Sequence, residues 1–246
     1  MKRLGINIDH IATIRNARGS SHPDPLSIAQ HVIHCGANSV TIHLREDRRH
    51  IRDADVIKIC KNKKILTNLE ISLNPEIIKI ALKNKPDFIC IVPENRKEIT
   101  TEGGLNLSNS KNKISKTILK FKKKKIRTSL FINPNLKDIK TAKELGVDCV
   151  ELHTGKISNF VKEKKFFINE YKKIKKCCEF ANKIGIEVHA GHGLDYKTTA
   201  ILSKVKEIKE FNIGHFIIGE SIIYGLKNTI KKFKKISNKY SLKYWV

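Results

Sequence analysis

Two histidines, three arginines and two carboxylates occur within the ten residues from Thr41 to His50, T-I-H-L-R-E-D-R-R-H. No hydrophobic core accepts so many ionisable groups, because an unpaired buried charge costs several kcal/mol or is neutralised. Histidine and carboxylate side chains can move protons near neutral pH, and arginine can bind phosphate. A solvated basic loop would also explain these charges. Function is favoured because the charges begin where an apolar, β-prone run ends.

Similar polar groups follow other apolar runs in the chain. They are Asn7, Asp9 and His10; His43, Arg45 and His50; Glu70; Thr100; Glu151 and His153; His189 and His192; and Gly214 and His215. Each histidine alone would more often be a hydrogen-bonded structural residue. In an α/β barrel, however, the carboxyl ends of all strands meet at one face. The pattern therefore predicts one acid–base site at that face.

Two glycine-rich segments predict a phosphate site. Ala190-Gly191-His192-Gly193 follows the seventh apolar run, and Ile213-Gly214-His215 lies at the eighth. Glycine lets bare backbone N–H groups approach a ligand, and barrels commonly bind phosphate with the loops after strands seven and eight. The alternative is that these glycines are simple turn residues.

Eight apolar runs alternate with helical segments. The strands are expected at Leu4–Asp9, Asn38–His43, Ile65–Glu70, Asp87–Val92, Ile126–Ile132, Asp148–His153, Ile186–His189, and Phe211–His215 with Ile217-Ile218. The helices are expected at residues 25–35, 53–61, 75–84, 115–125, 134–145, 161–184 (long enough for two pieces), from 196 onward, and 221–239. Residues 11–25 are expected to be mostly loop, and the polar residues 94–109 to form an active-site loop.

This alternation predicts one domain over residues 1–246, a single (β/α)₈ TIM barrel with extra short helices. The length suits that fold, which typically takes about 250 residues. A doubly wound open sheet is the alternative. No G-x-G-x-x-G follows the first strand, which weakens the case for a dinucleotide fold.

The six cysteines form no C-x-x-C pair and lie mostly in apolar runs. They are expected to be buried thiols in a reducing compartment, not disulfides or zinc ligands. The start of the chain has no signal-peptide pattern, and no apolar run approaches the roughly 20 residues that span a membrane. We therefore expect a cytoplasmic protein without a membrane partner.

The formal net charge of +25 lies largely in dispersed lysine runs, such as residues 122–125 and 231–235. Lysine, isoleucine and asparagine are all abundant, as an A+T-rich coding sequence would supply. We therefore attribute most of the charge to solvated helix faces, and expect the rest to attract anionic substrates. A basic protein that binds RNA or DNA is the alternative from another functional class.

A metal centre is a second possibility for the strand-end residues. Asp9, His43, Glu70 and His192 carry donor atoms that could hold a divalent ion. The sequence has neither a paired H-x-H at the first strand nor an H-E-x-x-H helix, so a metal-free acid–base site is favoured. A metal-dependent TIM-barrel enzyme acting on a sugar phosphate stays open as the alternative. A serine hydrolase lacks its G-x-S-x-G segment.

The chain closely resembles the pyridoxine 5'-phosphate synthase family. The matching segments run in order over nearly the whole chain: G-I-N-I-D-H-I-A-T-I-R-N-A-R-G, T-I-H-L-R-E-D-R-R-H-I, N-L-E, V-P-E, T-T-E-G-G-L, S-L-F-I, E-L-H-T-G, A-G-H-G-L and N-I-G-H. The resemblance implies a (β/α)₈ barrel assembled as a homo-octamer built from dimers. It also implies a transferase that condenses 3-amino-2-oxopropyl phosphate with 1-deoxy-D-xylulose 5-phosphate. The products would be pyridoxine 5'-phosphate, phosphate and water, with no metal and no cofactor.

The resemblance further implies a role for each matching residue. His43 and Glu70 match proton acceptors, His192 a proton donor and Glu151 a group that stabilises the transition state. Contacts to the aminooxopropyl phosphate are implied for Asn7, Arg18, Gly193, Gly214 and His215, with Arg18 reaching into a neighbouring subunit. Contacts to the deoxyxylulose phosphate are implied for Asp9, His10, Arg45, His50 and Thr100. Such a condensation needs several acids and bases near neutral pH, which agrees with these residue types. His189 departs from the family, where a small polar residue can stand.

Overall fold

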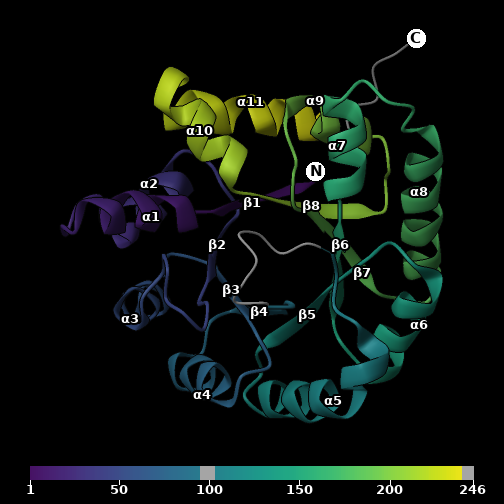
Figure 1. Cartoon of the computed structure of the whole chain (residues 1–246), viewed down its shortest axis with the longest axis horizontal. Coiled ribbons are helices and arrows are strands. Elements are labelled where there is room, and N and C mark those ends of the chain that lie inside the picture. The colour runs from purple at the N-terminus through teal and green to yellow at the C-terminus, as the bar shows by residue number, and fades with distance from the viewer. Residues whose placement is uncertain (95–102, 240–246) are drawn as a thin grey trace.

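Eight parallel strands close into a barrel in the computed structural model, which describes residues 1–94 and 103–239 (Figure 1). The strands are β1 (Arg3–Asn7), β2 (Ser39–His43), β3 (Thr67–Ile71), β4 (Phe88–Ile91), β5 (Arg127–Ile132), β6 (Cys149–His153), β7 (Glu187–Gly191) and β8 (Ile208–Ile213). The barrel closes where β1 pairs with β8, with Leu4 opposite Phe211. The predicted TIM barrel is confirmed, and the open sheet is excluded.

Helices surround the barrel on the outside (Figure 1). In the described residues they are α1 (Asp9–Arg18), α2 (Pro25–His34), α3 (Asp53–Lys61), α4 (Pro75–Asn84), α5 (Leu107–Lys123), α6 (Leu136–Leu145), α7 (Gly155–Lys162), α8 (Ile168–Lys183), α9 (Tyr196–Leu202), α10 (His215–Tyr224) and α11 (Leu226–Asn238). None of them combines the length and the apolar character that crossing a lipid bilayer requires. The extra helices are α1, α7 and α10, which directly follow β1, β6 and β8.

The two faces of the strands differ in polarity. One set of alternating residues, such as Leu4 and Ile6 of β1, is buried in the main hydrophobic core. The other set meets across the barrel interior and is largely polar. Thr41 of β2 and Glu151 of β6, for example, both contact Asn212 of β8. Successive side chains of a strand point to opposite faces, so the apolar set packs outward and the polar set is held inside.

The expectation of a loop over residues 11–25 is wrong, because α1 occupies Asp9–Arg18. Its buried face includes Ala12 and Arg15, and the Arg15 guanidinium pairs with Asp55 of α3 at 2.7 Å. An arginine at a buried helix position breaks the apolar periodicity that marks a helix in sequence. Gly19, with a φ of 70°, then ends the helix.

The expected eighth strand was placed too late in the chain. The strand is Ile208–Ile213, whereas Ile217 and Ile218 lie in α10. A short apolar run is ambiguous between a strand and a buried helix, which explains the error. The expected final helix is divided at Gly225 into α10 and α11, and α5 begins at Leu107 instead of residue 115. The expectation that residues 161–184 form two helical pieces is wrong, because one helix, α8, spans most of this range, and α7 ends at Lys162.

All six cysteines lie in the described part of the chain, and each is a buried free thiol. This confirms the expectation that they act as small apolar residues. Burial raises the pKa of the Cys149 thiol to about 12 and that of Cys60 to about 12. These thiols are therefore un-ionised near neutral pH and poor nucleophiles.

Candidate active site

A cavity of about 330 Å³ opens at the carboxyl ends of the strands. Twelve of the predicted site residues line it: Asn7, Asp9, His10, His43, Arg45, His50, Glu70, Glu151, His192, Gly193, Gly214 and His215. They come from strand ends that are far apart in sequence, so the predicted convergence is confirmed. Arg18, by contrast, is exposed at the end of α1 and is not among the described residues that line the cavity. Thr100 lies outside the described residues.

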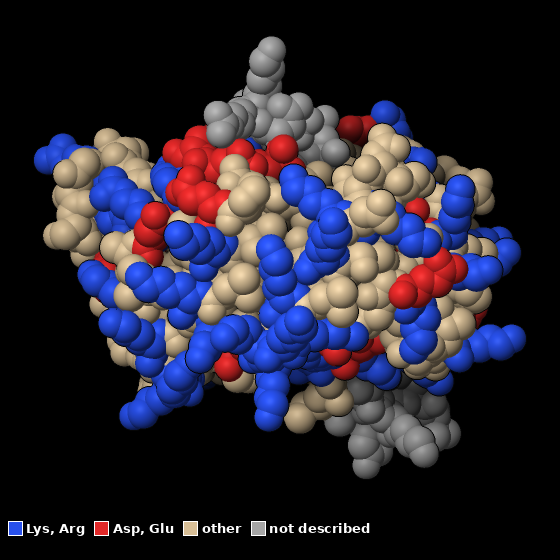
Figure 2. All heavy atoms as spheres, turned by 90° about the horizontal axis from the view of Figure 1, so that it is seen from below, with Lys and Arg blue, Asp and Glu red and all other residues tan. Residues whose placement is uncertain are grey.

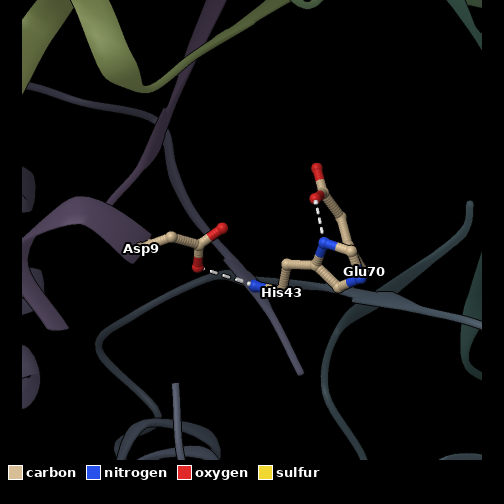
Figure 3. Close-up of side chains that lie close together, drawn as sticks. All are labelled: Asp9, His43 and Glu70. Carbon is tan, nitrogen blue, oxygen red and sulfur yellow. Dashed lines mark hydrogen bonds and ion pairs between the residues drawn. The ribbon is translucent and has the colours of Figure 1, made fainter. Parts of the chain in front are cut away.

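Asp9 joins the first two strands at the cavity floor (Figure 3). Its Oδ1 accepts a hydrogen bond from the backbone N–H of His43 at 2.9 Å, and its Oδ2 accepts one from Asn7 Nδ2 at 2.9 Å. The carboxylate is nearly buried at 7% exposure. These hydrogen bonds fix the position of the Asp9 carboxylate relative to the backbone of His43.

The His43 ring lies between two carboxyl groups. Its Nδ1 is 3.7 Å from Glu70 Oε2, and its Nε2 is 3.7 Å from Glu94 Oε2 (Figure 3 shows the former contact). Both distances exceed those of hydrogen bonds. Within the described residues, His43 Nε2 and Glu94 Oε2 have no hydrogen-bond partner, although both are buried. Catalytic hydrogen bonds are often long in ligand-free enzymes and shorten when substrate binds.

Glu70 is held at the end of β3, beside two other carboxyl groups. Burial raises the pKa of Glu70 well above its ordinary value, and the nearby charges of Glu151 and Asp9 raise it further. Carboxyl groups that repel one another in a desolvated site retain a proton to higher pH. A carboxyl group with a raised pKa holds its proton more tightly than an ordinary glutamate, and the carboxylate it forms is a stronger base.

Glu151 lies across the cavity from the Asp9 side, on β6. Burial raises the pKa of Glu151 to about 7, against the opposing effects of the His189 charge and a hydrogen bond from Asn212. Asn212 Nδ2 donates to Glu151 Oε2 at 2.7 Å. The cavity thus contains two carboxyl groups of raised pKa, Glu70 and Glu151, and that of Glu151 lies near neutrality.

His192 follows β7 in a left-handed conformation with a φ of 75°. The Thr154 hydroxyl lies 2.7 Å from the carbonyl oxygens of Gly191 and His192 and so fixes this turn. The His153 ring stacks on the His192 ring, with centroids 4.7 Å apart. Burial, with the charge of His192, lowers the pKa of His153 to about 4, so His153 is neutral at pH 7. His153 was predicted at a strand end, and here it supports the imidazole of His192.

The predicted phosphate region lies at the start of α10. Gly214 precedes the first residue of that helix, His215, and both line the cavity. A Cβ atom at Gly214 would lie 2.9 Å from Asn7 Cβ, so a larger residue would displace Asn7. The backbone N–H groups at a helix start favour anions. The His10 and His215 rings meet edge to face, with centroids 4.9 Å apart. Burial lowers the pKa of His10, and the charge of His215 lowers it further.

Arg45 and His50 line another part of the cavity wall. Arg45 is 4% exposed, and its Nε lies 3.6 Å from Glu94 Oε1. His50 Nδ1 lies 3.9 Å from Asp9 Oδ1, and burial lowers the pKa of His50. Both side chains are thus held beside carboxylates at the end of β2, where an anionic substrate could recruit them.

The prediction that His189 lies at the carboxyl end of its strand is wrong. β7 extends two residues further, to Gly191, so His189 is deeper in the barrel. There its Nε2 lies 2.8 Å from Glu187 and its Nδ1 lies 3.8 Å from Glu210.

Glu94 and Asn212 were missed as site residues. Glu94 belongs to the segment V-P-E and Asn212 to N-I-G-H, so both occur in motifs that had been noticed. Glu94 Oε1 accepts a hydrogen bond from the backbone N–H of Glu46 at 2.8 Å, which connects the ends of β4 and β2. The signal that could have found them was their place in these motifs.

Donor atoms of Asp9, His43 and Glu70 lie within 4.8 Å of one another, a spacing that could hold a metal ion. Within the described residues, His192 is not part of this group.

Comparison with known proteins gives a consistent result. A family model described as "Pyridoxal phosphate biosynthesis protein PdxJ" matches residues 4–239. A pyridoxine 5'-phosphate synthase of Pelagibacter ubique (strain HTCC1062) is 75% identical over 239 residues, covering 97% of this chain and 100% of the relative. A protein of the same name from Wolbachia sp. subsp. Drosophila simulans (strain wRi) is 46% identical and covers 94% of this chain and 97% of its own.

Among solved structures, one titled "Native KDPGal structure" superposes with a TM-score of 0.64 at 15% sequence identity. The superposition covers 97% of this chain and 96% of that one. A phosphoribosyl anthranilate isomerase structure superposes with a TM-score of 0.57 at 13% identity, over 97% of this chain and 100% of that one. At these identities the likeness concerns the barrel fold alone.

Proposed function

The chain belongs to the pyridoxal phosphate biosynthesis protein PdxJ family, and from this premise we propose how its barrel makes pyridoxine 5'-phosphate. It is an enzyme of vitamin B6 biosynthesis, with the activity for which its relatives are named. The proposed reaction condenses 3-amino-2-oxopropyl phosphate with 1-deoxy-D-xylulose 5-phosphate and releases phosphate and water. The observation that carries the proposal is one cavity that holds two carboxyl groups of raised pKa, the half-buried Glu70 and the buried Glu151, together with His43 and His192.

In this proposal the acid–base steps are divided between the two sides of the cavity. His43 and Glu70 accept protons as the amine joins the ketone and the resulting imine enolises. His192 donates a proton to a departing oxygen, and Glu151 stabilises positive charge in the transition state. The 3.7 Å separation of His43 Nδ1 from Glu70 Oε2 allows one proton to pass between these groups after a small movement. The neutral ring of His153 supports the imidazole of His192 by stacking.

Binding of the two phosphorylated substrates is assigned to different parts of the wall. Asn7, Gly214 and His215 lie at the start of α10, and Gly193 lines the same cavity from the loop after β7, an arrangement that favours the phosphate of the aminooxopropyl substrate. Asp9, His10, Arg45, His50 and Thr100 would contact the deoxyxylulose phosphate. The buried guanidinium of Arg45 supports this second assignment, because arginine binds phosphate through two parallel hydrogen bonds.

We infer a homo-oligomer from the surface of α1 and α10, and the resemblance to the family implies a homo-octamer built from dimers. These helices contact each other, and they carry the exposed apolar residues Ile14, Ile222, Ile223 and Tyr224. A cluster of this kind is typical of a subunit interface. Arg18 is exposed on the same helix as Ile14, which supports its proposed contact with a phosphate in a neighbouring subunit. We also propose a cytoplasmic location, where buried free thiols persist.

No metal, organic cofactor or nucleic acid is required in this proposal. Lys and Arg are scattered over the face shown in Figure 2, with acidic and neutral residues between them. This distribution favours solvated helix surfaces and a general attraction for anions over a dedicated nucleic-acid groove. Salt-sensitive binding to generic duplex DNA, tight at physiological ionic strength, would support the nucleic-acid alternative.

The test is incubation of the purified protein with both substrates, followed by detection of pyridoxine 5'-phosphate and one equivalent of phosphate. Activity should persist after dialysis against a chelator. The metal-dependent sugar-phosphate enzyme is the second candidate, favoured by the spacing of Asp9, His43 and Glu70. Elemental analysis that finds stoichiometric zinc or manganese, with activity lost on chelation, would select that candidate instead.

A further inference from the structure

We propose that Asn212 is a positioning residue, which holds one oxygen of the Glu151 carboxyl group in place for the reaction. The proposal rests on the function proposed above, in which Glu151 stabilises the transition state. Asn212 Nδ2 donates to Glu151 Oε2 at 2.7 Å. Both residues are buried, at 5% and 3% exposure, and both line the cavity. A short hydrogen bond in a desolvated site strongly restricts the orientation of a carboxyl group.

The far side of the Asn212 amide is fixed as well. The Thr41 hydroxyl lies 3.5 Å from Asn212 Oδ1, and the same hydroxyl accepts a hydrogen bond from Asn68 Nδ2 at 3.3 Å. Since the Thr41 oxygen accepts from Asn68, its proton is available for Asn212 Oδ1. The Asn212 oxygen is thereby directed to Thr41 and its NH₂ group to Glu151. Residues from β3, β2, β8 and β6 form one chain of polar contacts.

Two glycines leave the space that this pair occupies. A Cβ atom at Gly5 of β1 would overlap Asn212 Oδ1, and a Cβ atom at Gly191 of β7 would overlap Glu151 Oε1. Any other residue at either position would push the amide or the carboxyl group away. The barrel is therefore built around the Asn212–Glu151 pair from both neighbouring strands, as expected of a support for a functional group.

The same geometry gives Asn212 control over the charge of Glu151. Burial raises the pKa of Glu151 to about 7, and the Asn212 hydrogen bond acts in the opposite direction. The other titratable groups that act on Glu151 or respond to it are His189, which lowers its pKa, Glu210, which raises it, and Glu70 and Cys90. An N–H donor stabilises the charged carboxylate, so its removal should raise the pKa of Glu151 further.

The test compares Asn212→Leu with Asn68→Leu. Both changes remove a buried amide of equal exposure, 5%, from the same barrel interior, but only the first removes the donor to Glu151. For Asn212→Leu we expect turnover at pH 7 to fall roughly tenfold or more, and the limb of the pH–rate profile that Glu151 governs to move up by about one pH unit. Asn68→Leu, which removes only the far end of this contact chain and leaves the donor to Glu151, should move that limb much less. An equal shift in both variants would overturn the proposal.

A double-mutant cycle with Glu151→Gln separates positioning from a general structural effect. If Asn212 acts through Glu151, then Asn212→Leu should cost far less turnover in the Glu151→Gln background than in the wild type. Full additivity would contradict the proposal. If Asn212→Leu does not fold, Asn212→Asp serves in its place. Two carboxyl groups this close share a proton, so the governed limb should again move to higher pH.

Infrared difference spectroscopy can follow the titration of Glu151 independently of activity. The carboxyl band of Glu151 is identified as the band that is lost in Glu151→Gln. The carboxyl band should titrate at higher pH in Asn212→Leu than in the wild type. If the Glu151 band titrates at the same pH in Asn212→Leu as in the wild type, the proposed positioning role of Asn212 is wrong, whatever the activity of the variant. A wild-type protein that makes no pyridoxine 5'-phosphate, yet shows the shift, would instead overturn the proposed function and leave the Asn212–Glu151 contact standing.

Discussion

Both ends of the barrel interior contain glutamate and histidine side chains, but the pKa values of the carboxyl groups are shifted in opposite directions. The pKa of Glu187 is lowered at the amino-terminal end, whereas those of Glu70 and Glu151 are raised at the cavity end. At the amino-terminal end, Arg3, Arg127, Glu187, His189 and Glu210 form a closed network of ion pairs. Arg3 bonds to both Glu187 and Glu210, and Arg127 lies 2.8 Å from Glu187. Its partners hold the pKa of Glu187 well below the ordinary value, chiefly through the His189 hydrogen bond.

At the cavity end, by contrast, the pKa values of Glu70 and Glu151 are raised, and the contacts of His43 are 3.7 Å long. The difference lies in pairing. A carboxylate with arginine partners keeps its charge and serves stability, whereas one without such partners can exchange a proton. The density of charged residues is therefore a poor guide to the active site. A carboxyl group that lacks an arginine partner is a better guide.

The largest effect should follow from removal of the proton acceptors at the cavity end. Glu70→Gln and His43→Asn should each lower turnover roughly 10²- to 10⁴-fold, because each removes a group that accepts a proton. The melting temperature should change little, since both side chains lie at strand ends. Steady-state kinetics and thermal unfolding check the prediction. Near-normal turnover in either variant would remove that residue from the mechanism.

The second prediction concerns the stability cost of Glu151. The pKa of Glu151 is about 7 in the folded protein and 4.5 in its ordinary state, so between these values the folded chain retains a proton that the unfolded chain loses. Stability should therefore fall as the pH rises from 4.5 to 7. Glu151→Gln, which cannot ionise, should be more stable than the wild type at pH 8 by on the order of 3 kcal/mol. The two proteins should be similar at pH 4.

Chemical denaturation at both pH values measures this difference. A Glu151→Gln variant that is equally or less stable at pH 8 would show that the carboxylate is better compensated than its burial indicates. Turnover of Glu151→Gln should fall, because the ionised Glu151 carboxylate that destabilises the folded protein is also the group proposed to stabilise the transition state.

The third prediction concerns the amino-terminal end. Glu187→Gln should lower the free energy of unfolding by about 2 kcal/mol at pH 7, because Arg3 and Arg127 lose a charged partner in a half-buried site. The lowered pKa of Glu187 means that its contribution is present above its ordinary pKa and lost as the pH falls through the folded value. The difference from the wild type should thus narrow in acid. Turnover of Glu187→Gln should stay close to normal. A large loss of activity would show that the amino-terminal end of the barrel interior also contributes to catalysis.

The smallest effect is expected at His189, which lies between the two ends. Its charge lowers the pKa of Glu151, although its hydrogen bond is to Glu187. His189→Asn should raise the pH of the limb governed by Glu151 by a few tenths of a unit and change turnover at pH 7 by roughly twofold. A pH–rate profile measures this effect, and a shift downward would contradict it.

The sequence was sufficient to predict the barrel and most of the site because both depend on local pattern. His43 and Glu70 each end a short apolar run, and parallel strands bring such ends together. The helix α1 was not predictable, because the burial of Arg15 depends on partners distant in sequence, chiefly its ion pair with Asp55, forty residues away. The roles of Glu94 and Asn212 were not predictable either, because their partners, His43 and Glu151, are on other strands and distant in sequence.

The turn that contains His192 has a further consequence. Its φ of 75° is a region that a histidine occupies at a cost of about 1 kcal/mol, whereas glycine occupies it freely. In the segment A-G-H-G, His192 thus adopts a backbone conformation that favours glycine, and both of its neighbours in the chain are glycines. His192→Gly should relax the backbone of the loop while it empties the space of the ring. Free imidazole added to that variant could then occupy the space beside His153 and act as a diffusible acid.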